Sequence, residues 1–318
     1  MADSRDCIFK IVNTMRWTCR WLVLLLGAAA AAPVPAADTP PAGVAMRYTT
    51  EIISTVSGGN DRGTGWLGRL DVTADTGADL AGIPGLHAHL DLFLLHGPNF
   101  SDRYAGDIQT VSNIDAPSAL RPFEAFIEAP ILPNVRAKAG LFDLNSEFDV
   151  QSVGAPLLNS SFGIGPDFSQ SGLNGPSIYP VTAPGLFVAA EKDGRYVRVA
   201  IFDAVPGQLG HPSRFLPGGL GHDGALLVGE IGLPLGKTGH VQFGGWRYTD
   251  RFDRIDGRGR GISEGGYALI EARLAGREDG VALRGWLRVG LAADKVNSIG
   301  SYVGGGATYG DKKWLAGA

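Results

Sequence analysis

Residues 86–94 read LHAHLDLFL, and this stretch decides the fold. In a β-strand, successive side chains point to opposite faces, so every second residue shares a face. One face then carries Leu86, Ala88, Leu90, Leu92 and Leu94, and the other carries His87, His89, Asp91 and Phe93. The stretch therefore predicts a strand that has one face in an apolar medium and the other largely in water.

The same two-faced pattern recurs between clusters of Gly, Asn, Asp and Pro. Glu124 and Glu128 alternate with apolar residues, and so do Arg136 and Lys138. The pattern predicts about twelve strands, near 47–56, 65–75, 86–96, 120–130, 134–142, 184–191, 195–203, 224–235, 239–249, 265–275, 281–292 and 300–309. Such a repeated, weak alternation is typical of a transmembrane β-barrel, although a soluble two-sheet sandwich alternates in the same way. We expect an all-β fold, an antiparallel barrel of the bacterial outer membrane.

Two stretches, 97–119 and 143–183, lack strand character. Long irregular segments in a compact domain are usually functional. We expect each to form a plug or an inward-folded loop that constricts the lumen.

The N-terminus has the features of an export signal over residues 1–36. Arg16 and Arg20 precede an apolar run over 21–32 that is about a dozen residues long and too short to span a bilayer. Residues 37–46 then form a Pro/Ala-rich linker, and 47–318 are expected to form the barrel. Both cysteines, Cys7 and Cys19, lie in the signal, so the exported chain has no disulfide and no thiol-ligated metal.

The charge balance argues against nucleic-acid binding. The whole chain has 28 basic and 32 acidic residues, and loss of four basic and two acidic residues with the signal leaves a net charge of −6. Nucleic-acid binding needs clustered positive charge.

Several sequence blocks resemble a known family. They are GDIQTVSNIDA (106–116), FEAFIEAP (123–130), AGLFDLNSEF (139–148), NSSFG (159–163) and IYP (178–180), in this order. SGGN (57–60) and LAGIPGLHAHLDLFLLHG (80–97) extend the resemblance toward the N-terminus. The blocks resemble the carbohydrate-selective porin family typified by OprB, over about residues 48–202 and more weakly to 309.

This resemblance implies a monomeric barrel, usually of sixteen strands, that lies in outer-membrane lipid and is inserted by the outer-membrane assembly machinery. It implies passive diffusion of sugars such as glucose, with no cofactor. The sequence ends at 314–318 without the terminal aromatic of the family, and about four strands are unaccounted for. We therefore expect closure at about twelve strands or, as an alternative, a truncated non-conducting barrel that serves as a structural envelope protein. An exported, soluble sugar-binding sandwich is a further alternative.

Sugar passage needs a wet wall of hydrogen-bonding groups and some flat apolar surface. The alternation predicts the following lumen-facing side chains: Arg69, Asp71, His87, His89, Asp91, Glu124, Glu128, Arg136, Lys138, Arg198, Arg284, Trp286 and Arg288. The quartet Glu124, Glu128, Arg136 and Lys138 is the preferred solute contact, because adjacent strands would set acids against bases. The same quartet could instead be a salt-bridge ladder that stiffens the wall.

Other chemistry is less well supported. His87, His89 and Asp91 share a strand face and could hold a metal, but a hydrated wall explains them as well, so no metal is expected. Asp143, Asn145 and Glu147 place side-chain oxygens at alternate positions, as in a calcium loop, but the following glycine and the bidentate acid of an EF-hand are missing. GISEG (261–265) has the letters of G-x-S-x-G, but it leads into a predicted strand and is not the strand-to-helix elbow of a serine hydrolase. No glycosidase-like carboxylate pair is apparent, so no enzyme is expected. Trp66, Tyr104, Trp246 and Tyr248 are interpreted as aromatic belt residues at the membrane surface.

Overall fold

The computed structural model describes residues 41–207, 224–311 and 313–318. These residues belong to one compact unit, Ala31–Ala318. The predicted export signal, 1–36, and the first part of the predicted linker lie outside the described residues. β1 begins at Gly43, so the last residues of the expected linker belong to a strand.

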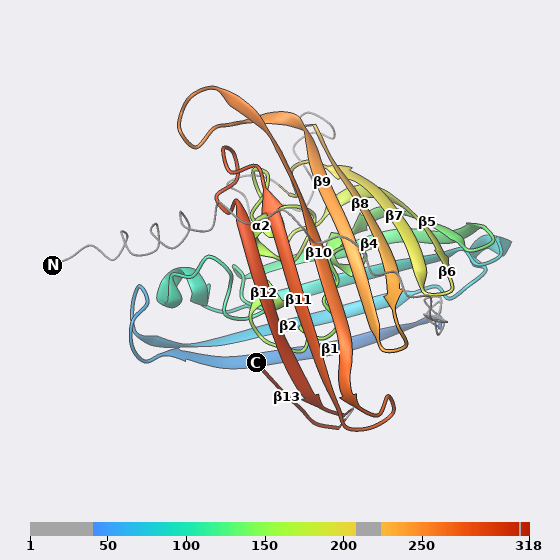
Figure 1. Ribbon diagram of the computed structural model, residues 1–318, viewed down its shortest axis with the longest axis horizontal. Helices are drawn as coiled ribbons and strands as arrows, with labels where there is room; N and C mark the ends of the chain where they lie inside the picture. Colours follow the sequence, from blue (N-terminus) through green and yellow to red (C-terminus); the bar gives the residue numbers. More distant parts are fainter. Residues whose placement is uncertain (1–40, 208–223, 312) are drawn as a thin grey trace. The chain divides into compact units, whose positions relative to one another are not determined.

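The described residues form one antiparallel sheet of 13 strands, in which each strand pairs with the next one along the chain (Figure 1). The strands are β1 (Gly43–Thr55), β2 (Gly63–Asp75), β3 (His87–His96), β4 (Ala119–Leu132), β5 (Val135–Phe142), β6 (Ala183–Lys192), β7 (Arg195–Asp203), β8 (Ala225–Leu235), β9 (Gly239–Asp253), β10 (Arg260–Gly276), β11 (Ala282–Ala292), β12 (Ser301–Gly310) and β13 (Leu315–Gly317). All twelve predicted strands are present. β13 was missed because three residues are too few to show alternation.

The helices are short. They are η1 (Leu80–Gly82), η2 (Ser101–Ala105), η3 (Leu144–Ser146), η4 (Ser160–Phe162) and α2 (Pro166–Ser169). Within the described ranges, no helix has the length and apolar character needed to cross a membrane.

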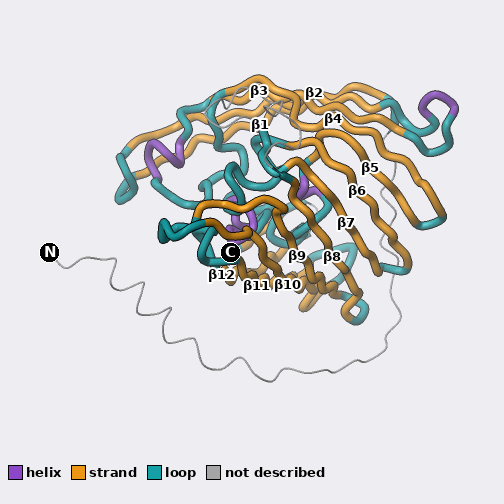
Figure 2. Tube along the Cα trace, turned by 90° about the horizontal axis from the view of Figure 1, so that it is seen from above, coloured by secondary structure: helices purple, strands orange, loops and turns teal. Residues whose placement is uncertain are grey.

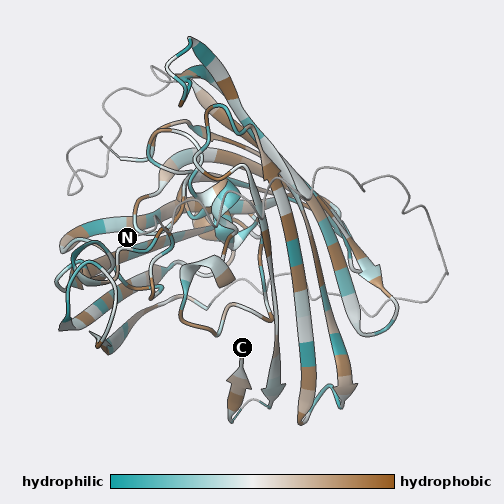
Figure 3. Ribbon diagram, turned by 60° about the vertical axis from the view of Figure 1, so that its left-hand side comes forward, coloured by the Kyte–Doolittle hydropathy of each residue, from teal (hydrophilic) through white to brown (hydrophobic). Residues whose placement is uncertain are grey.

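The two faces of the strands differ as the alternation predicts. In β3, the Leu90, Leu92 and Leu94 side chains point outward and keep 37%, 38% and 45% of their surface exposed. His87 and Asp91 lie on the other face and are buried. Figure 3 shows hydrophobic and hydrophilic residues alternating along neighbouring strands. The apolar face is thus turned away from the inner segments, as a lipid-facing wall requires.

The connections differ between the two ends of the sheet. Only two residues link β4 to β5 and β6 to β7, and three link β8 to β9. The long connections, β3 to β4 and β5 to β6, leave from the opposite end. The segment between β5 and β6 lies on the concave side of the sheet (Figure 2).

A core of aromatic side chains packs between this segment and the wall. Its buried members include Phe142, Phe148, Phe168, Phe187, Phe202, Trp246 and Tyr248. Trp246 stacks on Phe168 of α2 with ring centroids 4.2 Å apart. The interpretation of Trp246 and Tyr248 as belt residues is therefore wrong, because both point inward and hold the segment. Trp66 points outward and is 60% exposed.

Candidate functional site

A network of ion pairs lines the inner wall where β4, β5, β6 and β7 lie side by side. Glu128 on β4 pairs directly with Lys138 on β5 in the strand register, and its Oε2 lies 3.3 Å from Lys138 Nζ and 3.2 Å from Arg136 Nη1. Three of the four residues of the predicted quartet therefore meet as expected.

Glu147 completes this network. From the sequence, it was discussed only as part of a possible calcium loop. Its carboxylate accepts hydrogen bonds from Arg136 Nη2 at 2.6 Å and from Lys138 Nζ at 2.5 Å. Glu191 joins the other side, 2.8 Å from Arg198 and 3.5 Å from Arg136. We call these six residues, Glu128, Arg136, Lys138, Glu147, Glu191 and Arg198, the ion-pair network.

Glu124, the fourth member of the predicted quartet, has different partners. Its Oε1 accepts the backbone N–H of Asp143 at 2.9 Å, and its Oε2 lies 3.8 Å from His89 Nε2. Glu124 therefore fixes the start of the inner segment, whereas Glu128 opposes the two bases.

We call residues 143–153 the strap. Side chains of the wall hold it in place by forming hydrogen bonds with its backbone. Glu230 of β8 accepts the N–H of Asp149 at 2.8 Å, and Glu271 of β10 accepts the N–H of Val153 at 2.7 Å. Donors from the wall bind the strap carbonyls. Gln242 of β9 donates to Val150 O at 2.8 Å, and Arg198 donates to Glu147 O at 2.6 Å. The wall thus satisfies backbone groups that an irregular segment would otherwise leave unpaired.

Arg288 anchors the strap from β11. Its guanidinium forms ion pairs with Asp149 at 2.8 Å and with Asp167 of α2 at 2.5 Å, and all three side chains are fully buried. Trp286 lies beneath the same segment, with its ring 5.7 Å from that of Phe162. Both residues face inward as predicted, but the segment covers them. The expectation that they contact solute is therefore not supported.

A second group of predicted residues lies on β2 and β3. Arg69 lies 2.6 Å from Asp71 and 3.6 Å from Asp91, and its guanidinium stands over the rings of Phe93, Phe123 and Tyr179. His89 Nδ1 lies 2.7 Å from Asp75. In the part of the chain that the structure describes, no three His, Cys, Asp or Glu side chains are placed to hold a metal ion.

Burial shifts the pKa values of the strap carboxyls. Burial together with repulsion from Glu124 raises the pKa of Asp143 to about 7. Burial raises the pKa of Asp149 to about 6, against the opposing effect of Arg288. Burial would raise the pKa of Glu147 also, but hydrogen bonds from Arg136 and the charge of Lys138 lower it below its usual range.

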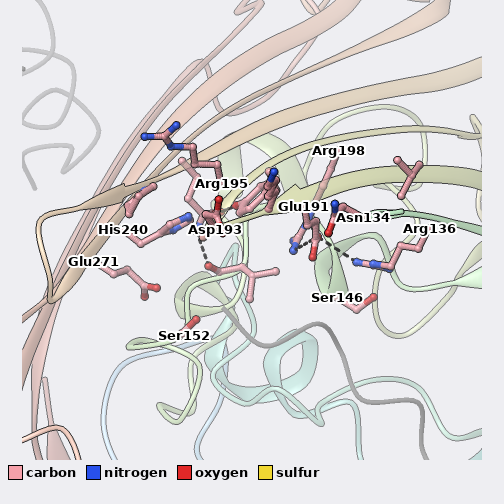
Figure 4. A pocket seen from close by; sticks show the side chains of 18 of the residues that line it. Asn134, Arg136, Ser146, Ser152, Glu191, Asp193, Arg195, Arg198, His240 and Glu271 are labelled. Carbon is pink, nitrogen blue, oxygen red and sulfur yellow. Dashed lines mark hydrogen bonds and ion pairs between the residues drawn. The ribbon is translucent and has the colours of Figure 1, made fainter. Parts of the chain in front are cut away.

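A cavity of about 1060 Å³ lies between the strap and the wall, at the end of the sheet with the short turns (Figure 4). Five of the predicted lumen residues line it: His87, Glu128, Arg136, Arg198 and Arg284. Sequence reasoning did not select Glu191, His240 or Glu271, which also line it. Glu191 and Glu271 carried a signal, because each falls on the polar face of a predicted strand.

Comparison with known proteins identifies a matching family and a similar solved structure. Residues 62–310 match the family described as "Carbohydrate-selective porin, OprB family". Among solved structures, OprB of Pseudomonas putida at high pH is similar to the chain, with a TM-score of 0.70 over 84% of this chain and 70% of that one. The sequence identity is 16%, so this likeness shows the fold alone. No curated protein sequence matches the chain.

The family match covers more than half of the chain and includes both long inner connections. The fold and the matched residues agree, and the matched family consists of non-enzymatic porins of the outer membrane. The chain therefore belongs to the OprB family of carbohydrate-selective porins of the bacterial outer membrane.

Proposed function

We propose that this porin lets small carbohydrates such as glucose diffuse passively into the periplasm. The observation that supports this most directly is the cavity of about 1060 Å³ between the strap and the ion-pair network. Its polar side chains offer donors and acceptors that replace part of the hydration shell of a sugar. Passage needs no chemistry and no energy coupling, and the barrel works as a monomer in outer-membrane lipid.

Selectivity in this proposal comes from the two inner segments, 97–119 and 143–183. Arg136 lines the cavity and is bound to Glu147 of the strap. The position of the strap and the charge of the wall are therefore coupled through one guanidinium. A solute that passes the cavity meets both.

The experiment compares single-channel conductance and glucose permeation in the parent chain and in Arg136→Ala. Removal of Arg136 leaves Glu147 with one cation fewer and widens the cavity, so conductance should rise and the preference for glucose over an amino acid of similar size should fall. Arg62→Ala, in the exposed connection between β1 and β2, is the matched control and should leave both unchanged. If Arg136→Ala matched the parent chain in conductance and in glucose preference, the network would serve only to stiffen the wall.

A second candidate is a non-conducting barrel with a structural role. One observation favours it: within the described residues, β1 pairs only with β2, and β13 pairs only with β12. An unpaired strand edge is costly in lipid, because its backbone groups find no partner. Absence of conductance from demonstrably inserted protein would favour this candidate over the pore.

A further inference from the structure

We propose that the cavity favours anionic monosaccharides, those that carry a carboxylate or a phosphate group, over neutral and cationic ones. The proposal rests on the proposed function, since a solute must enter the pore to meet the cavity. It specifies the solute class from the charges that line this one space.

The ion-pair network contributes little to that preference. Its cations, Arg136, Lys138 and Arg198, are matched by the acids Glu128, Glu147 and Glu191, with every ion paired within 3.6 Å. The network is neutral as a group, so the sign of the cavity depends on the other charged residues of its lining.

Those other residues are mostly basic. The cations are Lys192, Arg195, Lys237, Arg273 and Arg284, and the acids are Asp193, Glu271 and Glu278. The lining therefore has an excess of two positive charges, in a chain whose overall net charge is −4. Among the acids, Glu271 already accepts a hydrogen bond from the N–H of Val153, at 2.7 Å.

Three of these cations, Lys192, Arg195 and Lys237, lie at one end of the sheet, where a solute would enter or leave the pore. Lys192 and Arg195 flank the turn between β6 and β7, and Lys237 lies in the turn between β8 and β9. No carboxylate in the described part of the chain forms an ion pair with any of the three. Short turns face the periplasm in bacterial barrels, so these cations surround the inner mouth of the pore.

The lining also contains buried nitrogen atoms without a hydrogen-bond partner, which suits a solute rich in hydrogen-bond acceptors. Arg136 Nε, His87 Nδ1 and His240 Nε2 are buried nitrogens that have no hydrogen-bond partner in the protein. All three residues line this cavity. Arg136 Nε is only a donor, and a neutral imidazole nitrogen can serve as one, so the side chains beside the cavity retain hydrogen-bonding capacity that the protein leaves unused.

The expected preference is modest but measurable. Two net charges about 6 Å from the solute, in water at about 0.1 M salt, enrich a monovalent anion roughly three-fold over a neutral molecule of the same size. The enrichment should grow as the salt concentration falls, because screening weakens.

The test measures the reversal potential of the full chain in planar bilayers under a KCl gradient, and the swelling of liposomes in glucose, gluconate, glucose 6-phosphate and glucosamine. We expect a chloride-to-potassium permeability ratio of roughly nine, because the same charges enrich chloride about three-fold and deplete potassium about three-fold. Gluconate and glucose 6-phosphate should enter faster than glucose, and glucosamine more slowly.

Two double variants with the same change in charge test where the preference arises. Arg195→Glu with Lys237→Glu reverses two free cations at the cavity and should invert the ion selectivity. Arg62→Glu with Arg258→Glu changes exposed connections at the opposite end of the sheet and should leave the selectivity as in the parent chain.

The outcomes separate the two proposals. A cation-selective pore, or equal entry of gluconate and glucosamine, would overturn the anionic preference while normal glucose entry left the sugar pore intact. Equal effects of the two double variants would place the selectivity outside the cavity and would also overturn it. Absence of any conductance and of glucose entry would overturn the proposed function and this inference together.

Discussion

Arg288 illustrates how a single side chain fixes the inner segment of this porin. Its guanidinium binds two buried carboxylates, Asp149 and Asp167, and stands over the ring of Tyr267 at 5.0 Å. The backbone comes close around this group. A Cβ added at Gly290 would lie 2.0 Å from Asp167 Oδ2, and one added at Gly165 would lie 2.0 Å from Arg288 Nη1. These glycines leave room for the buried ion pairs.

Gly290→Ala should therefore destabilise the protein, by about 1–3 kcal/mol, because the new methyl group displaces a buried ion pair. Gly229→Ala is the matched control in β8, since a Cβ there meets nothing closer than 3.8 Å. The measurement is the denaturant midpoint of each variant in detergent. Equal midpoints for the two variants would show that the close contact at Gly290 is not sensitive to an added methyl group.

The sequence predicted the direction of wall side chains more reliably than their burial. Alternation placed Arg288 and Trp286 on the inner face correctly, but their burial depends on a segment that is distant in the sequence. Asp149 precedes Arg288 by 139 residues. Glu147 was missed for the same reason, because it lies in an irregular segment where no period assigns a direction.

At the scale of elements, the strap is an irregular segment whose position is set by the wall. Side chains from β4, β5, β7, β8, β9, β10 and β11 bind its backbone or its carboxyls. The absence of strand character over 143–183 was predictable from the sequence. The path of the segment was not predictable, because it follows from partners on seven strands.

Asp143 makes the strap sensitive to pH. Its pKa is raised from 3.8 to about 7 by burial and by the nearby Glu124, so the folded state prefers the protonated carboxyl. The stability that the strap owes to this group is present at low pH and is lost as the pH rises from about 4 to about 7.

The current noise of an open channel reports this loss of strap stability, because a less stable strap makes the pore diameter fluctuate. We expect more noise at pH 8 than at pH 5.5, and Asp143→Asn should remove the difference because the amide does not ionise. Asp256→Asn, in the exposed connection between β9 and β10, is the control. A pH dependence that persisted in Asp143→Asn would assign the effect to another group.

At the scale of the whole molecule, the alternation and the turn residues predicted every long strand and the all-β class. They predicted the antiparallel order too, since short Gly-, Asn- and Asp-rich turns join neighbouring strands. The short β13 and the start of β1 at Gly43 were beyond this reasoning, because neither shows a period. The family match over residues 62–310 agrees with the resemblance found in the sequence blocks.

The central claim is that this chain forms a sugar-conducting pore, and swelling of liposomes that contain the exported chain tests it most directly. Glucose, a disaccharide and an amino acid of similar size to glucose serve as the solutes. The account predicts faster swelling in glucose than in the amino acid, and slower swelling in the disaccharide. No swelling in any of the three, with the protein demonstrably inserted in the bilayer, would contradict it.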